Sequence, residues 1–225
     1  MILDHRASPR LDCDRVTKLF GSTVALWRVD LKAAAGEFVL VHGPNGCGKS
    51  TFLRIIAGLT TPSAGEVRWD GSSDARPRIA RVGHNSGLYD ALTPWEHFDL
   101  SARLGATDRD RALEIFAVLG ASHVLGRPCA GLSAGTRRRV ALARAFASVA
   151  DVLLLDEPLA SLDERAATGV VGLIEEAADR GQLVIGAAPS DPRFRAIAHR
   201  TVAFSDGHAL RSLAAVETRA EFDAG

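Results

Sequence analysis

The sequence predicts an α/β fold with a parallel sheet at its centre, an antiparallel β subdomain before it and an inserted helical subdomain. Apolar runs at residues 38–41, 152–155 and 183–187 are typical of strands buried on both faces of a parallel sheet. Segments with helical patterns alternate with these runs, as they do in α/β proteins. Residues 88–149 carry helical patterns alone. We therefore expect residues 1–225 to form a single domain with a helical subdomain at about 88–149.

The N-terminal part is expected to be antiparallel. Residues 11–19 and 24–31 read as two strands, and the turn Phe20-Gly21-Ser22 between them favours a hairpin. The strand at 38–41 precedes a helix, because apolar residues recur at helical spacing after residue 51. The expected elements that follow are a loop at 61–65, a strand at 66–69 and a short strand at 79–82.

The helical segment is expected to begin at Thr93-Pro94. Threonine can accept a hydrogen bond from a free N–H of the first turn, and proline is favoured at the first helical position because its missing N–H is not needed there. The remaining elements are expected to be helices at about 109–119 and 135–148, a strand at 152–155, a helix at about 164–179, a strand at 183–187, and a hairpin of 201–204 around Asp206-Gly207.

Composition narrows the classes of function. Lys plus Arg and Asp plus Glu both number 27, so no long-range field would recruit nucleic acid or anionic lipid. Three scattered cysteines fit a reducing cytoplasm better than a disulfide framework, and no histidine spacing suggests a transition-metal site. No run of about 18 apolar residues is present, so a soluble protein is expected. Arg137-Arg138-Arg139, the only basic run, is interpreted as a solvated helix face.

The most informative motif is residues 43–51, which lie between the strand at 38–41 and a helix, as in a P-loop. Glycines let successive N–H groups point at phosphate oxygens, and the start of the helix adds partial positive charge. Lys49 would reach the β- and γ-phosphates, and the Ser50 hydroxyl would bind Mg²⁺. The residues predicted to bind nucleotide are Gly43, Pro44, Asn45, Gly46, Cys47, Gly48, Lys49, Ser50 and Thr51.

Two acidic residues end the strand at 152–155. A carboxylate there, Asp156, can hold Mg²⁺, usually through water. The next residue, Glu157, is placed to act as the general base on the attacking water. Paired acids also end strands as solvated loop residues. The apolar run before them and the upstream phosphate loop favour the catalytic interpretation.

With these motifs, the chain resembles the ATP-binding cassette (ABC) ATPases, the nucleotide-binding subunits of ABC transporters, over nearly its whole length. Residues 132–145, which begin LSAGT, resemble the family signature and its helix, and Ser161-Leu162-Asp163 resembles the D-loop. The resemblance implies a RecA-like core and a head-to-tail dimer. Each ATP would lie between the phosphate loop of one copy and Ser133 and Gly135 of the other. It also implies that Phe20 stacks on adenine, with a core phenylalanine as the alternative.

Three departures from the family pattern bear on catalysis. The family's glutamine that faces Mg²⁺ is best matched by Asn85, which is one methylene shorter. The signature carries Thr136 in place of a glutamine. The family's histidine that contacts the γ-phosphate falls at Pro189, which has no side-chain donor. Loss of one positioned hydrogen-bond donor lowers the rate by about 10²–10³, so we expect slow turnover with intact ATP binding. Ser190 would compensate only weakly for the missing donor.

The predicted function is that of an ATP-hydrolysing subunit that uses ATP and Mg²⁺ to energise a membrane transporter. Its expected partners are transmembrane transporter subunits and a second copy or a paired cassette subunit, without nucleic acid, on the inner face of the cell membrane. Residues 84–88, the LSAG signature and the compact length resemble the haem-export subunit of cytochrome c maturation. The alternative is a hydrolysis-impaired regulatory cassette gated by ATP. A translation or DNA-repair cassette is disfavoured, because those proteins usually carry two cassettes or a long coiled-coil insertion.

Overall fold

The computed structural model describes residues 9–74, 76–189, 191–205 and 208–214. The strands and helices follow one another in the order that the sequence predicts, with one further helix at Pro192–Ile197. Two short 3₁₀ helices, at Ser122–Val124 and Cys129–Gly131, separate α3 from α4. The elements are β1 (Arg10–Phe20), β2 (Thr23–Ala34), β3 (Phe38–His42), α1 (Lys49–Ile56), β4 (Ala64–Trp69), β5 (Ile79–Val82), α2 (Pro94–Arg103), α3 (Arg109–Val118), α4 (Ala134–Phe146), β6 (Val152–Asp156), α5 (Glu164–Asp179), β7 (Leu183–Ala188), α6 (Pro192–Ile197), β8 (Arg200–Ser205) and β9 (His208–Ala214).

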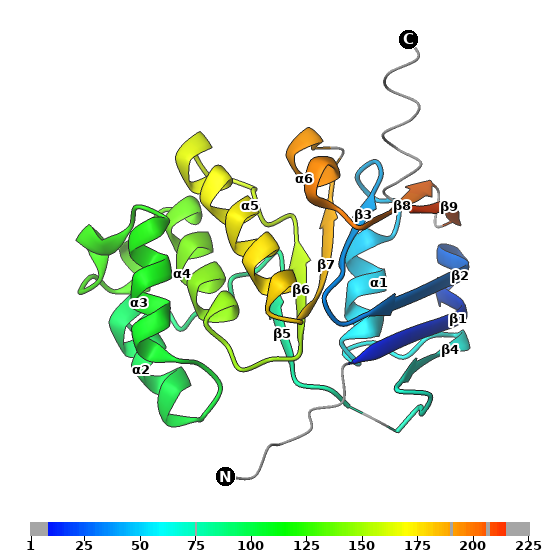
Figure 1. Ribbon diagram of the computed structural model, residues 1–225, viewed down its shortest axis with the longest axis horizontal. Coiled ribbons are helices and arrows are strands. Elements are labelled where there is room, and N and C mark those ends of the chain that lie inside the picture. Colours follow the sequence, from blue (N-terminus) through cyan, green and yellow to red (C-terminus); the bar gives the residue numbers. More distant parts are fainter. Residues whose placement is uncertain (1–8, 75, 190, 206–207, 215–225) are drawn as a thin grey trace.

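The strands form two sheets, which confirms the α/β prediction. The larger sheet has the order β5-β6-β7-β3-β8-β9 and is parallel except for the final β8–β9 pair. The smaller sheet, β2-β1-β4, is antiparallel. Figure 1 shows the small sheet at one end of the molecule and α2, α3 and α4 at the other, with the parallel strands between them.

Both faces of the parallel sheet are covered, which explains its uninterrupted apolar strands. In β6, Val152 and Leu154 pack in a core with α1 and the antiparallel sheet. Leu153 and Leu155 face the opposite way and pack in a core with α2 to α5. Each such buried leucine contributes about 1.5–3 kcal/mol to folding. The sheet therefore separates α1 on one face from α4 on the other.

The helical segment is anchored by a capped start and a buried aromatic pair. Thr93 accepts a hydrogen bond from the Glu96 N–H, and the Glu96 carboxylate in turn accepts one from the Thr93 N–H at 2.8 Å. The rings of Phe98 and Phe116 meet edge to face, with centroids 5.5 Å apart, and join α2 to α3. The predicted helix start at residue 94 is confirmed. That residues 88–149 act as a subdomain stays a prediction.

Several boundaries differ from the predictions. The strand β4 begins at Ala64, inside the expected loop, because that residue pairs with Thr17 of β1. The helix α6 was not predicted, although its start has a visible signal, since Asp191 caps it and Pro192 occupies its first position. The hairpin of β8 and β9 is confirmed by antiparallel pairing, while its turn at 206–207 lies outside the described residues. Within the described ranges, none of the helices has the length and apolar character that crossing a membrane requires.

Candidate functional site

The phosphate loop connects β3 to α1, where the sequence places it. Gly48 directly precedes the helix with a φ of 99°, a left-handed conformation that L side chains rarely adopt. A Cβ at Gly48 would lie 2.4 Å from the carbonyl oxygen of Ala25 in β2, so only glycine fits. The antiparallel sheet thus closes over the loop and holds its backbone close to the start of α1.

Lys49 is nearly fully buried and folds back over the loop. Its Nζ donates hydrogen bonds of 2.8 Å to the carbonyl oxygens of Gly43 and Pro44. Cys47 also lies inside the loop, 3.9 Å from the same Nζ, and is buried. The ammonium is therefore centred on the loop, and its carbonyl partners are weak compared with anionic phosphate oxygens.

Two of the three predicted Mg²⁺ ligands, Ser50 and Asp156, meet in the structure, although 106 positions separate them in the chain. The Ser50 hydroxyl donates to Asp156 Oδ1 at 2.9 Å. Asp156 is the last residue of β6 and is 2% exposed. A hydroxyl and a carboxylate at one sheet edge form the all-oxygen donor set that Mg²⁺ prefers. The residues present thus fit a Mg²⁺ ion, which Ser50 and Asp156 would hold.

Glu157 and Asn85 lie at the same edge of the sheet. They line a cavity of 250 Å³ together with the Ser50 and Asp156 pair. The backbone of Glu157 has a φ of 48°, and its N–H donates to the Ala187 carbonyl of β7 at 2.7 Å. These constraints fix the position of the backbone from which the Glu157 side chain extends. His84 also lines the cavity, although the sequence pattern points only to its neighbour Asn85.

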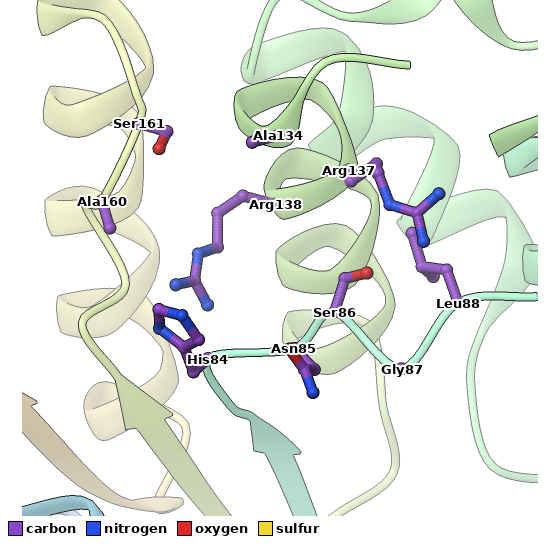
Figure 2. Close-up of a pocket in the computed structure, with 10 residues that line it drawn as sticks. All are labelled: His84, Asn85, Ser86, Gly87, Leu88, Ala134, Arg137, Arg138, Ala160 and Ser161. Atoms are coloured by element: carbon purple, nitrogen blue, oxygen red, sulfur yellow. The ribbon is translucent and has the colours of Figure 1, made fainter. Parts of the chain in front are cut away.

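A second pocket, of 460 Å³, lies between the loop after β5 and the start of α4 (Figure 2). Arg138 extends from α4 toward that loop and donates from Nη1 to the Gly83 carbonyl at 2.7 Å. Arg138 is 7% exposed, and burial lowers the pKa of its guanidinium while the charges of Asp156 and Glu157 oppose this shift. The interpretation of the Arg137–Arg139 run as a solvated face is therefore wrong for its central member.

The signature segment is fixed by contacts with neighbouring residues of the same chain. Ser133 caps α4, accepting from the Thr136 N–H at 3.2 Å and sharing a hydroxyl contact with Thr136 at 2.9 Å. A Cβ at Gly135 would lie 2.2 Å from the Ser161 carbonyl oxygen, so this glycine lets the D-loop approach the helix. Arg139 adds an ion pair with Asp163 at 2.6 Å. No pattern in the sequence links these two segments.

The signature and the phosphate loop lead into helices on opposite faces of the parallel sheet. The buried side chains of α4 belong to the core on one face of the parallel sheet, whereas those of α1 belong to the core on the other. Ser133 and Gly135 stand at the start of α4, and Lys49 and Ser50 stand at the start of α1. The two sets therefore belong to helices that pack on opposite faces of the sheet.

Phe20 ends β1 with a ring that is 53% exposed. The ammonium of Lys18 lies 5.1 Å from the ring centroid. This exposure excludes the core phenylalanine that the sequence left as an alternative. Stacking on adenine stays a prediction.

Replacing Phe20 by alanine is expected to weaken ATP binding about two- to tenfold, because an aromatic stacking contact contributes about 0.5–1.5 kcal/mol. Affinity for inorganic tripolyphosphate should be unchanged, since it has no base. Isothermal titration calorimetry with both ligands checks this, with Phe20→Trp as the variant that retains stacking. Equal losses for both ligands would contradict a contact with the base.

Pro189 follows β7 and is exposed, without a side-chain donor. The neighbouring strand offers His42, which lies opposite Ala188 in the β3–β7 ladder. His42 is half-buried, and burial, Arg195 and Lys49 together lower its pKa below the ordinary value. Ser190, the serine expected to compensate weakly for the missing donor, lies outside the described residues.

The parallel sheet, with the phosphate loop after β3 and paired acids at the end of β6, defines a P-loop nucleotide-binding protein. The family model described as ABC transporter matches residues 26–160. The chain therefore belongs to the ABC transporter family, as an ATP-binding cassette of the ATPase type.

Similar proteins in this family are named for different transport functions. The cytochrome c biogenesis ATP-binding export protein CcmA of Haemophilus influenzae is 34% identical over 195 residues, covering 82% of this chain and 89% of that protein. CcmA of Pseudomonas fluorescens is 37% identical, with 78% and 84% covered. The sn-glycerol-3-phosphate import ATP-binding protein UgpC 2 of Agrobacterium fabrum is 39% identical, with 69% and 44% covered. The match covers most of each CcmA protein but less than half of UgpC 2.

Solved structures share the architecture. The ATP-binding cassette MJ0796, solved as a dimer in a post-hydrolysis state with ADP and Pi, superposes with a TM-score of 0.81 at 29% identity, covering 91% of this chain and 98% of that one. An ATP-binding subunit of an ABC transporter superposes with a TM-score of 0.84 at 22% identity, covering 95% and 93%, and supports the fold alone.

Proposed function

We propose that this cassette hydrolyses Mg²⁺-bound ATP to energise a haem exporter that serves cytochrome c biogenesis. The observation that carries the hydrolytic part is the 2.9 Å contact between Ser50 and Asp156, with Glu157 in the same cavity. The transport class is supported by similarity to CcmA proteins over about four-fifths of the chain. The proposed location is the inner face of the cell membrane, against transmembrane subunits.

The residues of the loop bind and orient the triphosphate. On binding, Lys49 exchanges the carbonyl oxygens of Gly43 and Pro44 for phosphate oxygens, and the N–H groups at the start of α1 donate to the same anion. A Mg²⁺ ion held by Ser50 and Asp156 would neutralise charge that develops on the phosphates. Glu157 accepts the proton of the attacking water as its oxygen approaches the γ-phosphorus.

A head-to-tail pair of copies completes each site. The start of α4, with Ser133 and Gly135, supplies N–H groups to the γ-phosphate bound by the partner copy. The placement of α1 and α4 on opposite faces of the sheet supports this arrangement. Because Gly135 lies against the D-loop at Ser161, the signature and the D-loop would be presented to the partner side by side.

A second candidate is a regulatory cassette that closes on ATP and barely hydrolyses it. The observation that favours it is Pro189, which offers no donor where the family places a histidine. Loss of such a donor predicts a rate about 10²–10³ below that of a complete site. Steady-state ATPase activity measured beside a Glu157→Gln control separates the two candidates.

The transport proposal predicts that haem attachment to c-type cytochromes requires this chain. Deleting its gene in the source organism is expected to abolish covalent haem attachment to c-type cytochromes. The measurement is haem staining of membrane fractions after complementation with the wild-type chain or with Lys49→Ala. Restoration by the wild-type chain alone is expected, because transport needs bound ATP.

Normal cytochrome c in the deletion strain would contradict the haem-export assignment. Affinity purification of the tagged chain from detergent-solubilised membranes then tests the coarser claim. An integral membrane protein that copurifies at constant stoichiometry supports a transporter subunit. A chain recovered only without membrane proteins would contradict that claim as well.

A further inference from the structure

A second cation besides Lys49 faces the proposed Mg²⁺ site. Arg81, the third residue of β5, lines the 250 Å³ cavity with Ser50, Asp156 and Glu157. Its Nη2 lies 4.0 Å from Asp156 Oδ2, with side-chain exposures of 27% for the arginine and 3% for the aspartate. The phosphate-loop motif and the DEP motif give no indication of this residue.

The guanidinium of Arg81 is incompletely satisfied. Its Nε is buried and has no hydrogen-bond partner among the described residues. Its contact with Asp156 is longer than a hydrogen bond, so the pair is held by charge alone. A buried N–H donor that is left without an acceptor is costly. Its position is therefore determined by the packing around it and by the negative charge of Asp156.

The local backbone makes room for this arginine. A Cβ at Gly83 would lie 2.6–2.7 Å from three atoms of the Arg81 guanidinium, so a larger residue there would displace the group. Because side chains alternate along a strand, Arg81 lies on the same face of the sheet as Ile79, which packs with the core that contains α1. The guanidinium thus approaches the Ser50 side of the sheet.

Asp156 consequently has a different neighbour at each oxygen. Oδ1 accepts from the Ser50 hydroxyl, and Oδ2 faces Arg81. A divalent cation that binds the Asp156 carboxylate would therefore lie close to the positive charge of Arg81, which repels it. At these short, partly buried distances, salt screens such repulsion only weakly.

We propose that Arg81 is a resident counter-cation of Asp156 that competes with Mg²⁺ and so sets the free Mg²⁺ concentration at which the cassette binds nucleotide. This inference rests on the proposed function, because it takes Ser50 and Asp156 as the Mg²⁺ ligands. Arg81 acts through Asp156 and is a positioning residue. With the arginine charge removed, a metal ion meets one repelling charge fewer at this carboxylate.

The test is a Mg²⁺ titration of nucleotide binding without turnover. The probe is the fluorescent, non-hydrolysable analogue MANT-AMPPNP, mixed with the full chain in EDTA and titrated with MgCl₂. Arg81→Met is expected to lower the Mg²⁺ concentration at half-maximal binding by about three- to tenfold, since one repelling unit charge is removed near the metal. Arg81→Lys, which keeps the charge, should retain the wild-type midpoint.

Arg103→Met is the matched control, because the Arg103 side chain lies on α2, outside the lining of this cavity, and is 77% exposed to solvent. Its midpoint should shift less than twofold. An unchanged or higher midpoint in Arg81→Met, or an equal decrease in Arg103→Met, overturns the proposal. If thermal melting shows that Arg81→Met is unfolded, Arg81→Gln takes its place under the same criteria. A wild-type chain that binds no probe at any Mg²⁺ concentration contradicts the proposed function itself.

Discussion

Replacing Glu157 by glutamine is expected to reduce ATP hydrolysis by about 10²–10⁴-fold, because a positioned general base contributes a factor of that size. Glutamine has nearly the same shape but cannot accept a proton at neutral pH. ATP affinity should be retained, since Lys49 and the loop N–H groups that hold the phosphates are untouched. The measurement is steady-state phosphate release beside equilibrium binding of ATP.

Glu114→Gln is the control for this experiment. Glu114 lies on α3 with a 65% exposed side chain, paired with Arg111 on the same helix, so its loss should leave the rate unchanged. The result also separates the two proposed functions. Wild-type activity well above that of Glu157→Gln is expected for a transport subunit. Equal rates with intact ATP binding would instead support the regulatory cassette that Pro189 favours.

Replacing Lys49 by alanine is expected to weaken ATP binding by about 10- to 150-fold, because a charge-assisted hydrogen bond contributes roughly 1.5–3 kcal/mol. The lysine is 5% exposed, so water cannot easily replace its ammonium. The two loop carbonyls that it contacts, those of Gly43 and Pro44, would also lose their donor. Calorimetric titration with ATP in the presence of Mg²⁺ gives the affinity directly.

Lys32→Ala is the matched control, because the Lys32 side chain is 81% exposed on β2 and pairs only loosely with Asp12, at 3.6 Å. Its removal should leave ATP affinity unchanged. A Lys49→Ala chain that is folded, by its thermal melting curve, and binds ATP as the wild type does would refute the phosphate-loop assignment. The Mg²⁺ and general-base assignments would then also lose their basis.

Some parts of the nucleotide site could be predicted from the sequence in more detail than others. The phosphate loop is contiguous, and its glycines, Lys49 and Ser50 act through local backbone geometry, so a short motif is sufficient to find it. Asp156 was predictable because the carboxyl ends of parallel strands meet at one sheet edge, and β6 carries the apolar pattern of such a strand. The Ser50–Asp156 contact follows from these two facts.

Other features of the structure could not be predicted from the sequence pattern. Phe20 fits either a core or an adenine contact, because both favour an aromatic ring, and its 53% exposure decided against the core. The basic run at 137–139 looks uniformly polar, yet the helical turn buries Arg138 against Gly83. The helix α6 has a capping residue and a proline but only six residues, too few for a periodic pattern.

By itself, the sequence determined the class of fold, the order of its elements and the phosphate-binding loop, because these depend on local propensity and on patterns that repeat along the chain. The tertiary structure alone decided that Gly135 touches Ser161, that Arg138 reaches Gly83 and that Arg81 faces Asp156. Each of these contacts joins segments from different elements. A side chain's partner across such a contact depends on how whole helices and strands pack, which no local pattern encodes.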